Sequence, residues 1–210
     1  MSSAIEWGVS SAIEWGFASR ALPGQPTSGD LQVVKSFPGG VLMAALDGIG
    51  HGGEAASAAM IAAAILEAHP ADPVDALVQQ CHEALHDTRG VAMNVASFNI
   101  SQGMLTWLGV GNVVGVLLPQ SIAPVPPEKS LLLRAGVVGF QLPSSLEVDI
   151  VPVSEGDTLI FATDGIYSNF ARGLAGGQPP KKAAESILAQ HSKTTDDALV
   201  LVVRFSSGRL

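Results

Sequence analysis

Cysteine, positive charge and long apolar runs are all scarce in this sequence. Cys81 is the single cysteine among 210 residues, which excludes an intramolecular disulfide framework and a cysteine-rich zinc site. The 11 Lys and Arg are outnumbered by 19 Asp and Glu, giving a net charge of -8. Nucleic-acid-binding proteins usually display a basic face, so this balance argues against that class. No stretch approaches the roughly 20 apolar residues that span a membrane, and no signal peptide is recognisable. We therefore expect a cytoplasmic protein that contacts neither nucleic acid nor membrane.

The hydrophobic content is high enough to bury a substantial core. Hydrophobic side chains make up 47% of the chain, and we expect residues 1–210 to form one compact domain, as a monomer. Residues 1–12 are set apart, because "SSAIEWG" occurs at 2–8 and again at 10–16. This is either an extension, such as a duplicated strand start or a remnant of cloning, or a strand that pairs in two registers.

Strand patterns outnumber helix patterns along the chain. Helices are expected over 54–69, an alanine-rich segment buried on most sides, over a segment from Val74 to Leu85 with Asp72 as N-cap and Pro73 as first residue, and over 181–190. The helices are grouped and do not alternate with strands, which favours an α+β layered sandwich over a doubly wound parallel sheet. Strands are expected within 12–22, 31–37, 39–46, 91–100, 103–111, 112–119, 130–136, 146–153, 157–163 and 198–205.

Acidic residues stand where several of these strands begin or end. Asp47 and Asp164 each follow an apolar run, Asp196 precedes the last one, and Asp30 ends a polar turn. Such acids would repel one another unless a cation joined them. Mg²⁺ and Mn²⁺ prefer carboxylate, carbonyl and water oxygens. The glycines after Asp47 would give a flexible backbone, which lets the Gly48 carbonyl approach the same ion.

The order of these motifs resembles the metal-dependent protein phosphatases of type 2C. The motifs are Gly-Asp at 29–30, Asp-Gly-x-Gly-x-Gly from Asp47, "GVGN" at 109–112, Thr-Asp-Gly at 163–165 and Asp-Asp at 196–197. The likeness runs from Ile13 to Phe205, and the small size of the chain is closest to the compact SpoIIE-like and RsbX-like bacterial branch. "GVGN" itself is typical of a tight hairpin in which Asn112 takes a left-handed conformation.

The resemblance implies a four-layer α-β-β-α sandwich of two antiparallel sheets flanked by helices, with two Mn²⁺ or Mg²⁺ ions per chain at one end. By this likeness Asp47 bridges both metals, Gly48 offers its carbonyl to one, and Asp164 and Asp196 complete the other. Asp30 binds metal weakly or orients water on it. Water activated by the two cations would then attack phosphorus directly.

For several residues, a purely structural role is an alternative to a functional one. Asp197 is expected to support the ligands or cap a backbone group without touching metal, although the assignment could be shifted by one residue, with Asp197 and not Asp196 as the ligand. Larger relatives carry a histidine where this chain has Ile49, and His51 is expected to face solvent or cap a helix more readily than to act in catalysis. Arg89 is either a surface residue or a contact for substrate phosphate.

Two functions remain open. By resemblance, the chain is a phosphoserine/phosphothreonine phosphatase that acts on phosphorylated STAS-domain proteins of a stressosome-type complex. The alternative is a catalytically weak or inactive relative that serves as a protein-binding module. Cleavage of phosphotyrosine or of small phosphate esters is a third possibility. Retention of all the core acids favours the active enzyme, because a decayed site has no reason to keep repelling carboxylates together.

Overall fold

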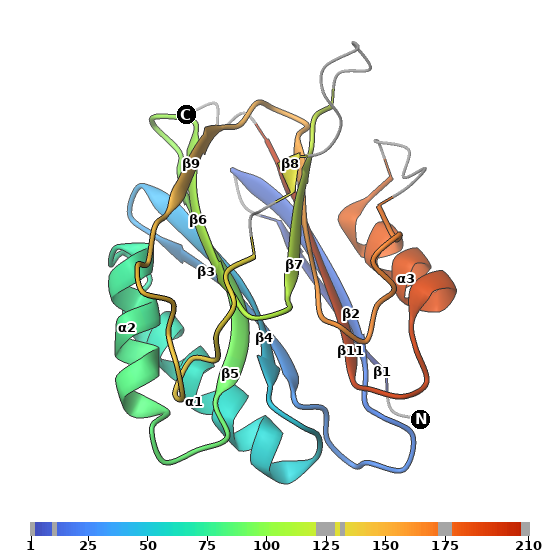
Figure 1. Cartoon of the computed structure of the whole chain (residues 1–210). Helices are drawn as coiled ribbons and strands as arrows, with labels where there is room; N and C mark the ends of the chain where they lie inside the picture. Colours follow the sequence, from blue (N-terminus) through green and yellow to red (C-terminus); the bar gives the residue numbers. More distant parts are fainter. Residues whose placement is uncertain (1–2, 10–11, 121–128, 131–132, 172–177, 207–210) are drawn as a thin grey trace.

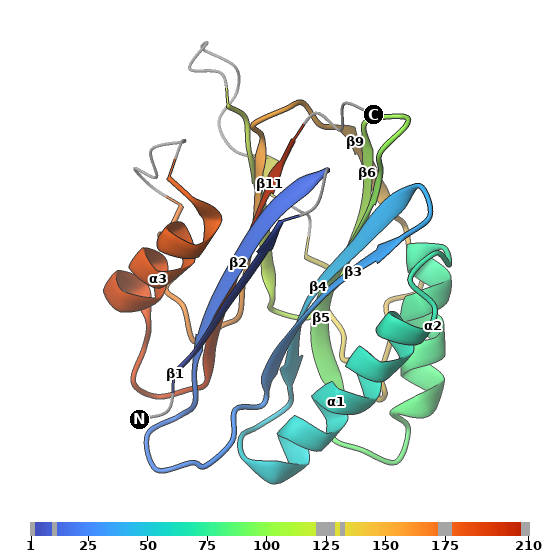
Figure 2. The ribbon, with the colours of Figure 1, turned by 180° about the vertical axis from the view of Figure 1, so that it is seen from behind.

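The computed structural model describes residues 3–9, 12–120, 129–130, 133–171 and 178–206. Over these residues the chain forms two antiparallel sheets that face each other, with helices on the outside (Figure 1; Figure 2). The elements follow the apolar runs of the sequence closely. For example, the run "ALVLVVRF" is strand β11 (Ala198–Phe205), which is buried along nearly its whole length because sheets and helices cover both of its faces.

The first sheet consists of six strands among the described residues, in the order β1-β2-β11-β10-β7-β8. Its members are β1 (Ser3–Val9), β2 (Ile13–Arg20), β7 (Val114–Leu118), β8 (Lys129–Ser130), β10 (Thr158–Ala162) and β11. We call it sheet A. The second, sheet B, has the order β3-β4-β5-β6-β9. Its members are β3 (Asp30–Phe37), β4 (Gly40–Gly48), β5 (Val91–Asn99), β6 (Met104–Val110) and β9 (Asp149–Pro152).

Three hydrophobic clusters separate the four layers. One lies between the sheets and includes Trp107, Phe161 and Phe205. The second lies between sheet B and the helices α1 (Gly53–Ala68) and α2 (Val74–Ala84). The third lies between sheet A and α3 (Pro180–His191). The predicted four-layer α-β-β-α sandwich is therefore confirmed.

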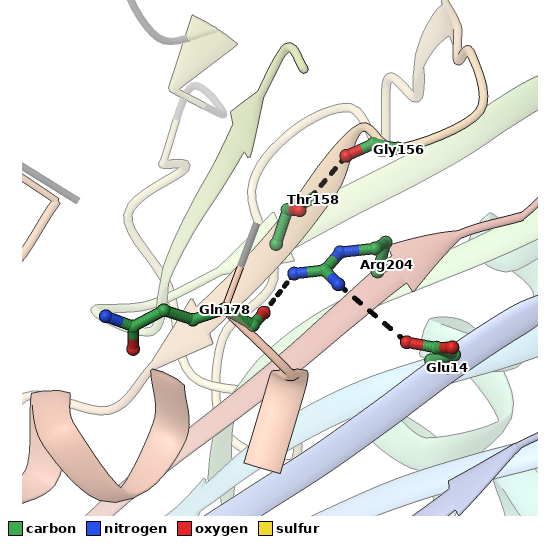
Figure 3. A network of polar contacts seen from close by, with 5 residues as sticks. All are labelled: Glu14, Gly156, Thr158, Gln178 and Arg204. Atoms are coloured by element: carbon green, nitrogen blue, oxygen red, sulfur yellow. Dashed lines mark hydrogen bonds and ion pairs between the residues drawn. The ribbon is translucent and has the colours of Figure 1, made fainter. Parts of the chain in front are cut away.

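Helix α3 is fixed to sheet A by a polar network at its first turn. Arg204 of β11 donates a hydrogen bond to the backbone carbonyl of Gln178 and lies 3.8 Å from the Glu14 carboxylate of β2 (Figure 3). Gly16 of β2 permits this close approach, because a Cβ there would lie 2.5 Å from the Lys181 backbone. The network holds the helix start, and the C-terminal end of α3 reaches the end of the sandwich where the acids gather.

The two copies of "SSAIEWG" form one hairpin. β1 from the first copy pairs antiparallel with β2 from the second, so that Trp7 lies opposite Gly16 and Gly8 lies opposite Trp15. A Cβ at Gly8 would lie 2.5 Å from the Trp15 ring. The first copy is thus a strand on the edge of sheet A, in a single register, and the pairing sets the tryptophan of each copy against the glycine of the other.

Three local predictions were wrong. Ser130 of the predicted strand 130–136 lies in β8, but residues 133–136 form no strand, and Arg134 makes an isolated bridge to Val110. Helix α2 has Pro73 as its N-cap, and the carboxylate of Asp72 accepts from Gln80. Helix α1 is not buried on most sides, because Met60 is 55% exposed on its outer face. In "GVGN" Gly111, the residue without a Cβ, has a positive φ of +96°, and the left-handed conformation of Asn112 stays a prediction.

No helix within the described residues is both long enough and apolar enough to cross a membrane.

Candidate metal centre

Four strand ends bring the acids together at one end of the sandwich, the lower end in Figure 1. Asp30 opens β3 and Asp47 lies near the end of β4, directly opposite it in the antiparallel pairing. In sheet A, Asp164 follows β10 and Asp196 precedes β11, the strand that pairs with β10. The Thr163 hydroxyl links the two sheets here, since it donates to the Asp30 carboxylate over 2.7 Å and accepts from the Leu199 backbone. The predicted acids therefore lie at the same end of the sandwich, where strands of both sheets end.

The acids interact strongly enough to change their protonation. Burial and the charges of Asp164, Asp196 and Asp197 raise the pKa of Asp47 to about 8. Burial and the charge of Asp47 raise the pKa of Asp30 well above its ordinary value. The pKa of Asp164 is raised by burial and by Asp196, although Lys193 and a hydrogen bond from Asn112 oppose this. Because each of these pKa values is raised, a cation close to the carboxylates would stabilise their ionised forms.

Asp197 serves a different purpose from its neighbour Asp196. Its carboxylate is buried and accepts backbone hydrogen bonds from Leu22 over 2.6 Å and Gly29 over 2.7 Å. These bonds hold the turn that leads into Asp30. Asp196 is half-buried and one of its carboxylate oxygens accepts from the Asp197 backbone. The arrangement matches the expected supporting role of Asp197 and leaves Asp196 as the candidate ligand.

The glycines beside the acids are needed for packing more than for flexibility. A Cβ on Gly48 would lie 2.1 Å from the carbonyl oxygen of Ala55, so α1 packs directly on the backbone at this point. A Cβ on Gly165 would lie 1.8 Å from the Asp197 carbonyl oxygen. A Cβ on Gly29 would lie 2.8 Å from the Cβ of Ala55. The expected reason for Gly48, a flexible backbone, is therefore replaced by the close approach of a helix.

Two contacts of Asp164 were missed by sequence reasoning. The Asn112 amide donates to its carboxylate over 2.8 Å, and the Lys193 ammonium donates to its backbone carbonyl over 2.5 Å. The sequence predicts a turn at Asn112, and no motif marks Lys193. These contacts join segments that are distant in sequence. The sequence therefore offers only one indication of them, which is that both residues are polar and stand near the motifs.

The remaining candidates lie outside the group of acids. Ile49 packs against the core between the sheets. His51 is exposed, and the N-cap of α1 is Gly52, so His51 does not cap that helix. Arg89 forms an exposed ion pair with Glu54 over 2.5 Å and lies beside Gly50 in the loop after Asp47. A single exposed ion pair contributes little stability.

The donor set suits a hard divalent cation. Carboxylates, with the Gly48 carbonyl beside them, are the oxygen ligands that Mg²⁺ and Mn²⁺ prefer. Burial next to other acids makes the ionised forms costly, and a cation offsets this cost. In the described part of the chain, however, no three His, Cys, Asp or Glu side chains lie close enough together to hold a metal ion as they stand. The acids are thus grouped within electrostatic reach of one another but do not form a closed ligand shell.

Comparisons with known proteins agree with this arrangement. The family model for Stage II sporulation protein E (SpoIIE) matches residues 38–206. The phosphoserine phosphatase RsbX of Bacillus subtilis (strain 168) is 22% identical over 187 residues, which cover 87% of this chain and 90% of that protein. A crystal structure of RsbX in complex with magnesium superposes with a TM-score of 0.86 at 20% identity, covering 97% of this chain and 100% of the other. A structure described as the bacterial stressosome, adapted to control secondary messenger signaling, has a TM-score of 0.82 at 29% identity, covering 91% and 99% of the two chains.

Proposed function

Because this chain belongs to the SpoIIE family of type 2C-like protein phosphatases, we propose that it removes phosphate from phosphoserine and phosphothreonine in a metal-dependent reaction. The chain is a protein serine/threonine phosphatase by this membership. We also propose which metals the protein binds, which residues hold them and which substrates it acts on. A single observation carries the proposal: acids from four strand ends lie within electrostatic reach of one another, where their raised pKa values favour a bound cation.

Each acid has a defined part in this proposal. Asp47, the Gly48 carbonyl, Asp164 and Asp196 would hold two Mn²⁺ or Mg²⁺ ions, with Asp30 as a weaker ligand or as an acceptor for water. The metals, when bound, supply an activated water near neutral pH and offset charge on the phosphoryl oxygens. The chain itself supplies rigid placement. Thr163 fixes Asp30, Asn112 fixes Asp164, and Asp197 holds the turn before Asp30.

The proposed substrates are phosphorylated STAS-domain proteins of a stressosome-type complex in the cytoplasm. Two relatives support this class of partner. One is named a phosphoserine phosphatase, and the other belongs to a structure described as the bacterial stressosome.

Hydrolysis of p-nitrophenyl phosphate, followed by a phosphorylated STAS domain, tests the proposal. We expect activity with Mn²⁺ or Mg²⁺ and none in excess chelator. Asp47→Asn, Asp164→Asn and Asp196→Asn should each lower kcat/KM by at least about a hundredfold, because the cations that activate water are lost.

The matched control is Asp87→Asn, which removes an exposed carboxylate outside the group of acids. It should keep the wild-type rate, and circular dichroism should show that all four variants fold. Undiminished turnover in chelator would reject the metal-dependent reaction. Folded wild-type protein that binds the phosphorylated STAS domain without hydrolysing either substrate would point to the alternative, a protein-binding module.

A further inference from the structure

A pocket of about 230 Å³ opens beside Asp164. Its inner lining is apolar and buried, with Ala162 and Phe170 each 1% exposed, and belongs to the core between sheet A and α3. Its outer lining is polar or amphipathic and includes Tyr167, which is 55% exposed, and Lys193. Because Asp164 lines this pocket and is also one of the grouped acids, the pocket adjoins the proposed metal centre at this residue.

Lys193 is held firmly in this pocket. Its backbone N–H donates to the Gly165 carbonyl over 2.7 Å, and its backbone carbonyl accepts from Arg20. Its ammonium lies 5.6 Å from the centre of the Tyr167 ring and donates to the Asp164 carbonyl. An ammonium has three N–H donors, and the Asp164 carbonyl is the one hydrogen-bond acceptor that it meets among the described residues. Two donors therefore remain for a ligand.

The charge of Lys193 matters because its surroundings are acidic. The chain carries a net charge of -8, and the neighbouring acids would repel an anionic segment of substrate. Lys193 places a positive charge at the point where such a segment would leave the metal centre. Residues of an extended peptide are spaced about 3.5 Å apart, so a side chain one or two positions from a phosphorylated residue can reach a pocket that begins at Asp164.

On the basis of the proposed phosphatase function, we infer that this pocket receives an acidic side chain that flanks the phosphorylated residue of the substrate, with Lys193 as the residue that selects it. The Lys193 ammonium donates to the flanking carboxylate. The exposed Tyr167 ring packs beside the carbon chain of the bound residue. The phosphoryl group itself lies at the grouped acids and not in this pocket.

Two phosphoserine peptides test this inference on the full chain with saturating Mn²⁺. The peptides are identical except that glutamates flank the phosphoserine in one and glutamines in the other. We expect the wild type to prefer the glutamate peptide by about fivefold in kcat/KM, mainly through KM, as a charge-assisted hydrogen bond at a partly exposed site would give. The preference should shrink as salt is raised. Lys193→Gln should reduce the ratio to about one, whereas Lys193→Arg, which keeps the charge, should retain a preference.

The ratio between peptides is the decisive measurement because Lys193 also contacts Asp164, so its loss lowers the rate on every substrate. Lys182→Gln is the matched control. It removes the same charge from an exposed position near the start of α3, roughly 14 Å along the helix from its C-terminal end, and should keep the wild-type ratio.

Equal kcat/KM values for the two peptides in the wild type would overturn the inference, and this measurement needs no variant to fold. Equal losses on both peptides in Lys193→Gln would also overturn it, because Lys193 would then act on the phosphoryl group or on Asp164. If the wild type hydrolysed neither peptide nor p-nitrophenyl phosphate, the proposed function itself would fail, which is a different result from hydrolysis without preference.

Discussion

Asp30 and Asp197 are both buried carboxylates at the same end of the sandwich, but they differ in their hydrogen-bond partners. Asp197 accepts from two backbone N–H groups, which fixes the turn around Leu22 and Gly29. Asp30 accepts from the Thr163 hydroxyl and lies opposite Asp47, so its charge faces another acid. A carboxylate satisfied by backbone donors is structural, whereas one set against acids gains from a cation. We therefore expect Asp30 to tune metal affinity.

We predict that Asp30→Asn raises the Mn²⁺ concentration needed for half-maximal activity by about tenfold or more, while the rate at saturating Mn²⁺ falls less. The amide keeps an oxygen for Thr163 but removes the negative charge, and residues that support metal ligands typically affect affinity by 10–100-fold. Metal titrations of p-nitrophenyl phosphate hydrolysis measure this. Asp75→Asn, at an exposed position on α2, is the control. An unchanged metal requirement for Asp30→Asn would contradict the prediction.

Single residues also mark the limit of what the sequence predicts. Asp30, Asp47, Asp164 and Asp196 could be identified because each stands where an apolar run begins or ends, and that position survives folding. Asn112 and Lys193 could not be identified as partners of Asp164, because 52 and 29 residues separate them from it along the chain. Their contacts depend on how strands from different parts of the chain are placed side by side. The ligand roles of the acids and of Gly48 remain predictions.

Helix α1 meets strand β4 at the proposed metal centre with almost no space between their backbones. A Cβ on Gly48 would lie 2.1 Å from the Ala55 carbonyl oxygen, and Gly48 donates its N–H to the Gly29 carbonyl. The alanines Ala55, Ala58, Ala59 and Ala62 continue this close packing along the helix. Small residues thus allow α1 to pack directly on β4 beside Asp47, which explains Gly48.

We predict that Gly48→Ala lowers the free energy of unfolding by about 2 kcal/mol or more, because the methyl group collides with backbone that has no freedom to move. Gly53→Ala is the matched control, since a Cβ at Gly53 meets nothing within 4 Å and alanine suits a helix better than glycine. It should be neutral or slightly stabilising. Urea unfolding of both variants, with Mn²⁺ absent, measures the difference, and equal stabilities would reject the packing argument.

Element boundaries were predicted best where an apolar run had clear ends. The last strand, 198–205, was predicted at its observed bounds. The segment 133–136 failed because its pattern of apolar residues fits a strand, but its backbone has only isolated partners there. The start of α2 was displaced by one residue, since the fixed φ of Pro73 also suits a cap position. The N-terminal duplication could not be assigned from sequence, because either copy has the residues for a strand.

Across the whole molecule, the sandwich gathers acidic residues at the end where β3 and β11 begin and β4 and β10 end. Burial and mutual repulsion raise the pKa of Asp47 to about 8 and raise those of Asp30 and Asp164. The sandwich therefore holds these acids in an environment that disfavours ionisation in the absence of a cation. Because a raised folded-state pKa means that the folded protein holds protons more tightly than the unfolded chain, global stability is linked to both pH and metal.

We predict that, in excess chelator, stability decreases as pH rises. The stabilising effect of the protonated Asp47 is complete below the ordinary pKa of 3.8 and is lost as pH rises to about 8. Between pH 5 and pH 8 the free energy of unfolding should fall by at least about 1 kcal/mol, since one pKa unit corresponds to about 1.4 kcal/mol. Asp47→Asn should flatten this dependence, whereas Asp75→Asn, on the exposed face of α2, should retain it.

Mn²⁺ should stabilise the wild type more at pH 8 than at pH 5, because it binds the ionised acids of the folded state. Urea unfolding at several pH values, with chelator or Mn²⁺, tests both effects. A chelated protein more stable at pH 8 than at pH 5 would show that the folded chain already neutralises these acids by itself.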